Sequence, residues 1–310
     1  MLGFARGPLS HPHHIGVEAS ADAIDALADE VGMPADLAVL LVAGLDFTDE
    51  EDAYRAEAER RGWAEEVVVG NDTFAVLRAG TERGWGVAVT CGAGMNCVGI
   101  GPDGRQVRFP SLGPISGDAM DGAGAVGLAA VAAAARSEDR RGPSTELERR
   151  VPAHFGLVTP VELARAVHRG DIPWRRLGDL TPLVFEASET DAVASEIVDR
   201  LAAEVVALVR AAVTRLELAA EEIEVVLGGG LLQSGNKRLL GGIEDGLREI
   251  GPGLSMHVAQ SRPIVGAVLT GLDRLGAESA AYARARKELD RATESPGDVT
   301  GDTAAVSELP

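Results

Sequence analysis

Apolar and polar positions along the first part of the chain predict strands that alternate with helices. The apolar run Leu37–Val42 is typical of a buried strand, and the charged stretch Asp49–Arg61 that follows has helical composition. A second apolar run, Val67–Val69, precedes a helical segment, Thr73–Ala79. Val17–Val31 carries apolar side chains at helical spacing. Strands alternating with helices predict a layered α/β domain.

A second group of strands and helices begins near Gly86. Its elements are predicted from short apolar runs bounded by glycine and from longer stretches with apolar residues at helical spacing. They are the strands Gly86–Cys91, Asn96–Ile100, Ile223–Leu227 and Leu254–Val258, and the helices Gly122–Ala135, Asp191–Glu217, Asn236–Ile250 and Pro263–Leu275. The fold class is therefore α/β throughout.

These two strand-rich segments, each followed by helices, predict two domains. We place an N-terminal α/β domain at residues 1–82 and a C-terminal α/β domain at residues 83–282, with the boundary near Arg83. Residues 283–310 are charged and contain Gly, Thr and Ser, which predicts a disordered tail. The 310 residues, 45% of them hydrophobic, supply enough apolar surface for two cores.

Charge and cysteine content restrict the partners. A net charge of −19 disfavours attraction to nucleic acid or to an anionic membrane, so neither is expected as a partner. Met1–Ser10 lacks a basic segment followed by an apolar core, and no apolar run reaches the roughly 18 residues that would span a bilayer. We expect a cytoplasmic protein. Its two cysteines, Cys91 and Cys97, are predicted to be reduced, buried thiols.

Candidate chemistry is concentrated between Val67 and Asp121. The turn Gly92-Ala93-Gly94 joins two predicted strands, and its glycines allow backbone N–H groups to face an anion such as phosphate. Asp72 follows a strand end, and Asp118 lies in the loop Gly113–Asp118. Two acids and a glycine turn are the components of a phosphotransfer site. Structural roles are open alternatives: Asp72 as a helix N-cap and Asp118 as an Asx-turn residue.

The histidine cluster His11-Pro12-His13-His14 suggests either a metal site or a loop at the protein surface. No cysteine or acid lies beside it at ligand spacing, and proline is typical of a loop. We favour a solvent-exposed or substrate-rim loop and predict no metal-ligating residues in the chain.

Several motifs, in order, resemble those of one family. They are Asn71-Asp72, Cys91-Gly92-Ala93-Gly94-Met95-Asn96, Gly117-Asp118, Gly142–Leu147 and Gly228-Gly229-Gly230. Together they resemble the BadF/BadG/BcrA/BcrD-type ATPases, most closely the N-acetylglucosamine kinase-like branch. The resemblance implies a two-domain, actin-like ATPase (ribonuclease H-like) fold with the nucleotide in the interdomain cleft. It also implies ATP and Mg²⁺ as cofactors.

The resemblance implies a role for each matching residue. Asp72 would be the general base that accepts the proton of the attacking sugar hydroxyl, and the histidine-bearing loop would help to hold the sugar. The remaining implied contacts are Asn71, Gly117 and Asp118 to the sugar; Gly92, Ala93, Gly94 and Asn96 to the ATP phosphates; and Gly228, Gly229 and Gly230 to adenosine.

Two departures from the family pattern affect the implied activity. Relatives begin with a β-hairpin whose Asp-Gly-Gly turn binds phosphate, and this chain starts after that point. We expect an upstream start and an N-terminal domain truncated as given; the alternative is a protein that lacks the first phosphate loop. In the second loop, Ala93 and Met95 replace a threonine and a serine. Each lost hydroxyl contact to phosphate would cost about 1.5–3 kcal/mol.

The sequence therefore supports ATP-dependent phosphorylation of an amino sugar, with a small-molecule sugar as partner and a homodimer left open. The alternative is a catalytically impaired member that acts as a nucleotide- or sugar-binding regulatory module. A third class in the family holds an iron–sulfur cluster through cysteines of two subunits. We set it aside because Cys91 and Cys97 both belong to the predicted phosphate hairpin.

Overall fold

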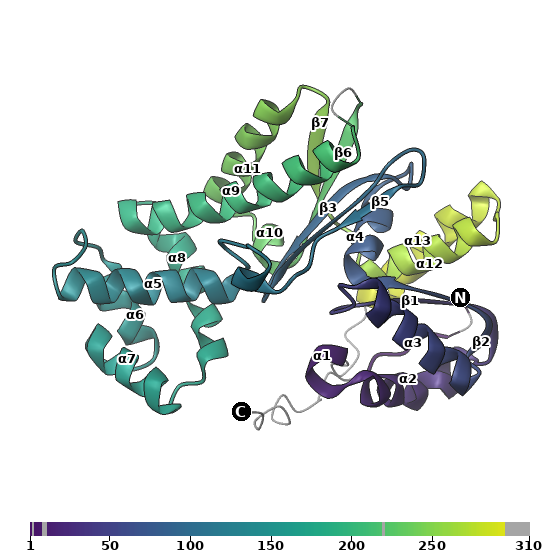
Figure 1. Ribbon diagram of the computed structural model, residues 1–310, viewed down its shortest axis with the longest axis horizontal. Coiled ribbons are helices and arrows are strands. Elements are labelled where there is room, and N and C mark those ends of the chain that lie inside the picture. The colour runs from purple at the N-terminus through teal and green to yellow at the C-terminus, as the bar shows by residue number, and fades with distance from the viewer. Residues whose placement is uncertain (2, 8–10, 219–220, 295–310) are drawn as a thin grey trace. The chain divides into compact units, whose positions relative to one another are not determined.

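The protein is described by a computed structural model covering residues 1, 3–7, 11–218 and 221–294 (Figure 1). The chain forms two compact units, each of which contains a parallel strand pair and flanking helices. The first unit combines residues 1–79 with the segment that begins at Gln260, and the second unit comprises Gly80–Ala259.

The first unit is built on a two-stranded parallel sheet. β1 (Ala35–Val42) pairs with β2 (Ala64–Asn71) in a register that places Val42 opposite Asn71. Its helices are α1 (Pro12–Ile15), α2 (Val17–Val31), α3 (Thr48–Arg61), α4 (Asp72–Gly80), α12 (Pro263–Arg274) and α13 (Ser279–Glu294). These bounds agree with the predicted alternation of strands and helices, to within a few residues at each end.

Two apolar clusters hold the helices of the first unit to its sheet. Tyr54, Ala58 and Trp63 of the α3 region pack with Val67 and Val69 of β2, and the hydroxyls of Ser20 and Tyr54 are 2.8 Å apart in this cluster. A second cluster joins α12 to α13. α12 also approaches α4 closely, because a Cβ atom on Gly266 would stand 1.8 Å from the carbonyl oxygen of Ala75.

The second unit contains a five-stranded sheet in the order β5-β4-β3-β6-β7. β3 (Gly86–Cys91), β4 (Met95–Ile100) and β5 (Gln106–Arg108) are antiparallel neighbours, whereas β6 (Ile223–Gly228) pairs in parallel with both β3 and β7 (Leu254–Val258). Its helices are η1 (Gly113–Ile115), α5 (Ala123–Glu138), α6 (Leu147–His154), α7 (Pro160–Arg169), η2 (Trp174–Leu180), α8 (Thr181–Ala187), α9 (Ala192–Arg215), α10 (Gly230–Gln233) and α11 (Lys237–Ile250).

Most of the second unit's core lies between this sheet and the helices packed on it. α9 and α11 pack side by side (Figure 1). Their apolar faces and the side chains of the strands form one buried cluster. α9 is capped by Asp191, the first residue of the predicted helix, whose carboxylate accepts hydrogen bonds from Val193 N and Ala194 N at 2.8 and 2.9 Å. α5 packs against η2, α6, α7 and α8, and both α5 and α8 also contact α9, so these helices join the same core.

The last helices of the chain differ from the sequence-based division. α12 and α13 pack in the first unit, whereas the predicted boundary assigned residues 83–282 to one domain. α13 continues to Glu294, so the predicted start of the tail at residue 283 falls inside a helix. Residues 295–310 of the predicted tail lie outside the described residues. In the part of the chain that the structure describes, none of the helices combines the length and the apolar character needed to cross a membrane.

Candidate active site

Asp72 lies where β2 passes into α4 in the first unit. Asn71, the last residue of β2, is buried with 2% exposure, and its Oδ1 atom accepts a hydrogen bond from Thr73 N at 2.9 Å. Its Nδ2 atom donates to Oδ1 of Asp46 at 3.0 Å. Both ends of the Asn71 amide are therefore engaged within the protein. This holds the first turn of α4, which begins at Asp72.

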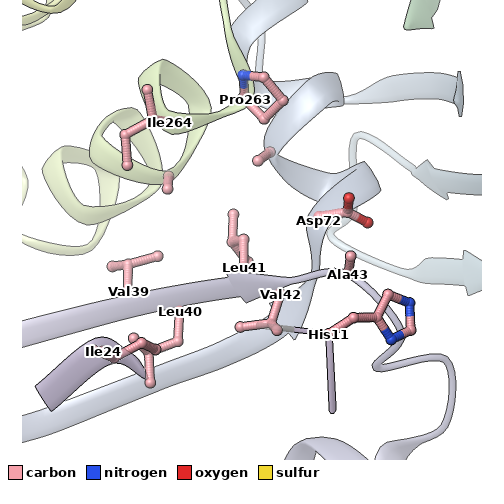
Figure 2. A pocket seen from close by; sticks show the side chains of 12 residues that line it. His11, Ile24, Val39, Leu40, Leu41, Val42, Ala43, Asp72, Pro263 and Ile264 are labelled. Atoms are coloured by element: carbon pink, nitrogen blue, oxygen red, sulfur yellow. The ribbon is translucent and has the colours of Figure 1, made fainter. Parts of the chain in front are cut away.

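The Asp72 carboxylate lines a cavity of about 440 Å³ in the same unit. Figure 2 shows this carboxylate and the imidazole of His11 at one end of the cavity, near Ala43. The rest of the wall is apolar and comes from β1, α2, α4 and α12. It consists of Ile24, Val39, Leu40, Leu41, Val42, Ala75, Pro263, Ile264 and Ala267. A small polar ligand could meet an acid and an imidazole there against an apolar wall.

The surroundings of Asp72 favour its protonated form. Burial raises the pKa of its carboxyl group, and the negative charge of Asp46 raises it further. The backbone N–H groups of Thr73 and Asp72 act in the opposite direction but do not reverse the shift. A raised pKa makes the carboxylate a stronger base, which suits proton abstraction from a hydroxyl group.

Two polar residues of this region were not assigned by the sequence reasoning. Asp46 is 6% exposed and lies in the loop after β1, as Asp72 follows β2. The carboxyl ends of parallel strands meet at one edge of a sheet, so two acids after two successive strands were a usable signal. The histidine-bearing loop was expected to help hold the sugar, but His11 itself was not singled out within it.

The imidazole of His11 packs over Gly44, where a Cβ atom would stand 2.1 Å from the ring. Burial lowers the pKa of His11, and the charges of His14 and His13 lower it further. Its Nδ1 atom is buried and has no hydrogen-bond partner among the described residues. His11 therefore lines the Asp72 cavity, while its Nδ1 atom is enclosed by protein without a hydrogen bond.

In the second unit, the turn Gly92–Gly94 joins β3 to β4 and meets the N-terminus of α5. Gly92 N donates to Gly94 O at 2.8 Å, and Ala123 N donates to Gly92 O at 2.9 Å. Gly122 has φ +126°, and a Cβ atom on it would lie 2.8–2.9 Å from the backbone of the turn. Only glycine permits this approach. A helix N-terminus beside a glycine turn suits an anion such as phosphate.

The second glycine turn, Gly228–Gly230, lies beside the first. β3 and β6 are parallel neighbours, with Thr90 opposite Gly228, so both turns follow the carboxyl ends of adjacent strands. Gly229 has φ +85°, and a Cβ atom there would stand 2.4 Å from the carbonyl oxygen of Cys91. The structure thus brings the predicted phosphate turn and the predicted adenosine turn together. Cys91 is a free, buried thiol, as predicted, and burial raises its pKa to about 12.

The other predicted residues of the second unit lie on β4 and in the loop after η1. Asn96 is opposite Thr90 in β4, and its Oδ1 atom accepts from Cys97 N at 2.7 Å. Asp118 follows Gly117 in the loop after η1 and is half-buried. Its Oδ2 atom accepts from the Ser116 hydroxyl at 2.6 Å, and its N–H donates to Gly113 O.

A larger cavity of about 720 Å³ opens beyond α10, where the chain leaves the Gly228–Gly230 turn. Residues on both sides of it come from the α8 region and from the start of α11. They are Pro182, Phe185, Glu186, Ser188, Glu189, Ser234, Gly235, Asn236, Lys237 and Arg238. Sequence reasoning did not identify this cavity, because its two walls are separated by about fifty positions in the chain.

Within the described residues, no group of three or more His, Cys, Asp or Glu side chains is arranged to hold a metal ion. Mg²⁺ bound with a nucleotide differs from such a site, because phosphate oxygens and water supply most of its ligands and one or two carboxylates complete them. The glycine turns and the α5 N-terminus fit the phosphates that would carry that ion.

Comparison with known proteins identifies the family. Residues 10–271 match the BadF/BadG/BcrA/BcrD ATPase family, and the chain belongs to it. It is 29% identical over 195 residues to the N-acetylmuramic acid/N-acetylglucosamine kinase of Clostridium acetobutylicum, covering 63% of each chain. It is 26% identical over 167 residues to the N-acetyl-D-glucosamine kinase of Dictyostelium discoideum, covering 53% of this chain and 52% of that one. The matches span less than two thirds of the length of these relatives.

Solved structures show the same fold. A candidate N-acetylglucosamine kinase from Chromobacterium violaceum is 22% identical with a TM-score of 0.66, over 86% of this chain and 90% of that one. Another, from Porphyromonas gingivalis, is 19% identical with a TM-score of 0.55, over 86% and 88%. The predicted family and the predicted actin-like α/β fold are confirmed.

Proposed function

We propose that this protein is an ATP-dependent kinase that phosphorylates an amino sugar such as N-acetylglucosamine. The observation that carries the proposal is the Asp72 carboxylate, which lines a cavity and has a raised pKa in a chain of this family. The two curated relatives add support, since both are named as kinases of N-acetylated amino sugars.

In the proposed reaction, a sugar hydroxyl attacks the γ-phosphorus of ATP, its proton passes to Asp72, and ADP leaves. ATP supplies the phosphoryl group, with Mg²⁺ as counter-charge. The protein contributes position and electrostatics: the Asp72 carboxylate lies against a largely apolar wall, and the imidazole of His11, which lines the same cavity, would contact the sugar. Asp118, with Gly117, is assigned to the sugar as a second contact.

The nucleotide is assigned to the two glycine turns of the second unit. Gly92 N and Ala123 N already donate within the turn, so the N–H groups of Ala93 and Gly94 and those that follow Ala123 in the first turn of α5 would face the phosphates. The Gly228–Gly230 turn would lie against adenosine, and the 720 Å³ cavity beyond α10 is large enough to receive the base. Asn96 would contribute through its side-chain Nδ2 atom, because a phosphate needs a donor and the Oδ1 atom of Asn96 already accepts from Cys97 N.

A second function is a regulatory module that binds nucleotide or sugar without turnover. Ala93 favours it, because this exposed residue at the tip of the turn has no hydroxyl group for phosphate. Met95 does not add to that argument. Its side chain is 5% exposed and packs in the apolar core, so a hydroxyl on that side chain would point away from a ligand at the turn.

Coupled ADP release across a panel of hexoses and hexosamines, with calorimetric titration of Mg²⁺–ATP, tests the proposal. We expect faster phosphorylation of N-acetylglucosamine than of glucose, together with ATP binding. ATP or sugar binding without phosphorylation of any sugar would establish the regulatory function instead. Absence of both binding and turnover would overturn both functions.

A further inference from the structure

Asp46 is an acid buried at the same strand ends as Asp72. It is 6% exposed and lies in the loop after β1, and the pairing of Val42 with Asn71 brings that loop beside the β2–α4 junction. A buried carboxylate is costly unless hydrogen bonds stabilise it. The Asn71 amide donates one such bond to Asp46 at 3.0 Å.

Asn71 joins Asp46 to the helix that carries Asp72. Its Oδ1 atom accepts from Thr73 N at 2.9 Å, so its Nδ2 atom must point the other way, toward Asp46. An ionised carboxylate only accepts hydrogen bonds, so it can pair with that end of the amide and not with the oxygen. Asp46 thereby selects one orientation of the Asn71 side chain. That orientation places an acceptor on the first turn of α4.

We propose that Asp46 is a positioning residue for Asp72: acting through the Asn71 amide, it holds the start of α4 and so aims the Asp72 carboxylate into the cavity. The inference rests on the proposed function of Asp72 as general base. It assigns no contact between Asp46 and the substrate, and Asp46 does not line the cavity.

The charge of Asp46 has a second effect on the same group. After burial, it is the largest cause that raises the pKa of Asp72. Other ionisable groups face this region from the neighbouring elements. His11 lies before α1, and buried Glu51 of α3 comes within 3.7 Å of where a Cβ on Gly70 would stand. α12 contributes no ionisable side chain to the cavity lining, only those of Pro263, Ile264 and Ala267.

The test separates charge from position with two variants of Asp46 in the full chain. Asp46→Asn keeps the shape and can still accept from Asn71, whereas Asp46→Ala removes both charge and acceptor. The Asp72 carboxyl is titrated by ¹³C NMR, with its resonance assigned by its loss in Asp72→Asn. Asp49→Asn, which changes an exposed acid in the first turn of α3, is the matched control.

In Asp46→Asn we expect the pKa of Asp72 to fall and the acid limb of the kcat/KM profile to move to lower pH. Its plateau should drop about three- to tenfold, because a weaker base accepts the proton less readily. Asp46→Ala should lower kcat further, by about 10²-fold, with a smaller change in the KM for the sugar, because the base is no longer aimed. Asp49→Asn should match the wild type.

A variant of Asn71 keeps the inference testable if both Asp46 variants fail to fold. Asn71→Ser leaves a short acceptor for Thr73 N but cuts the link to Asp46. It should lower kcat while the pKa of Asp72 stays raised. Unchanged titration of Asp72 in Asp46→Asn, or unchanged kcat in Asn71→Ser, would overturn the inference. Absence of sugar phosphorylation by the wild type would overturn the proposed function alone, since the NMR titration needs no turnover.

Discussion

β1 and β6 are both rich in apolar residues, and each pairs in parallel with a neighbour in its own sheet, but the environments of the two strands differ. None of the eight residues of β1 is fully buried, whereas five of the six residues of β6 are. β6 has a strand on each side and helices packed on its sheet. β1 has one strand neighbour among the described residues, β2. The number of neighbours, not the hydrophobicity of the strand itself, decides how much of it is buried.

This difference corresponds to a difference in what each unit offers chemically. In the first unit, loosely covered β1 leaves room for a cavity that contains an acid and an imidazole. In the second unit, the backbone approaches closely at Gly122 and at Gly229, and these contacts shape the two adjacent glycine turns. We assign proton transfer to the first unit and nucleotide binding to the second.

The largest effect is expected from a substitution of Asp72, which tests whether proton transfer and nucleotide binding belong to different units. Asp72→Asn should lower kcat by about 10²–10⁴-fold, because the proton acceptor is lost. Affinity for Mg²⁺–ATP should stay within about twofold of the wild type, because the proposed phosphate-binding turns belong to the other unit. Coupled ADP release and calorimetry measure the two quantities. Near-wild-type turnover would show that Asp72 is not the base. A parallel loss of ATP affinity would show that the first unit also contributes to nucleotide binding.

Much of this arrangement could be predicted from the sequence. Short apolar runs bounded by glycine located β3, β4 and β6, and the strand-end position singled out Asp72. Such features depend on residues that are close in the sequence, so local rules suffice for them.

What was missed depends on contacts between distant residues. Asp46 meets Asn71 only because β1 and β2 pair in one register, and no local pattern fixes that register. α12 packs in the first unit, where Gly266 lies against the backbone of Ala75. A small residue in a helix predicts close packing, but it does not identify the helix against which it packs. The second cavity has the same origin, since α8 and α11 form its two walls.

A pair of glycine substitutions tests whether the second unit's turn depends on close backbone contact. Gly229→Ala should lower the free energy of unfolding of that unit by about 2–4 kcal/mol, through overpacking against Cys91 and a left-handed backbone. Gly230→Ala is the matched control: a Cβ atom there meets open space, so its change should stay within about 0.5 kcal/mol. Urea unfolding monitored by hydrogen exchange in β3 and β6 gives both values. Equal effects would refute the packing argument.

Matched valine substitutions test the comparison of the strands directly. Val226→Ala in β6 removes methyl groups from a side chain with no exposure and should cost about 2 kcal/mol. Val39→Ala in β1 removes them from a half-exposed side chain at the cavity wall and should cost less than about 1 kcal/mol. Amides of β1 should also exchange faster than those of β6. Equal losses of stability would show that β1 is covered in solution.

The smallest expected effect compares the helix starts of the two units. Glu50 reaches back to the N–H groups of Asp46 and Phe47 at the start of α3, and Glu162 reaches back to those of Val158 and Thr159 at the start of α7. At pH 7, Glu50→Gln and Glu162→Gln should each lower the free energy of unfolding by about 0.5–1 kcal/mol, because a negative charge beside a helix N-terminus is lost.

The effect of Glu50 should depend on pH. Burial alone would raise the pKa of its carboxyl group, but hydrogen bonds from Phe47 N–H, the His13 side chain and Asp46 N–H hold that pKa below its usual value. A carboxyl whose pKa is lower in the folded state stabilises the fold in its ionised form. Its contribution is therefore complete above the pKa of an unfolded glutamate and is lost as the pH falls through the folded value. The stability difference between wild type and Glu50→Gln should shrink between about pH 5 and pH 3 in chemical denaturation. A difference that grows on acidification would show that Glu50 is stabilised in its protonated form.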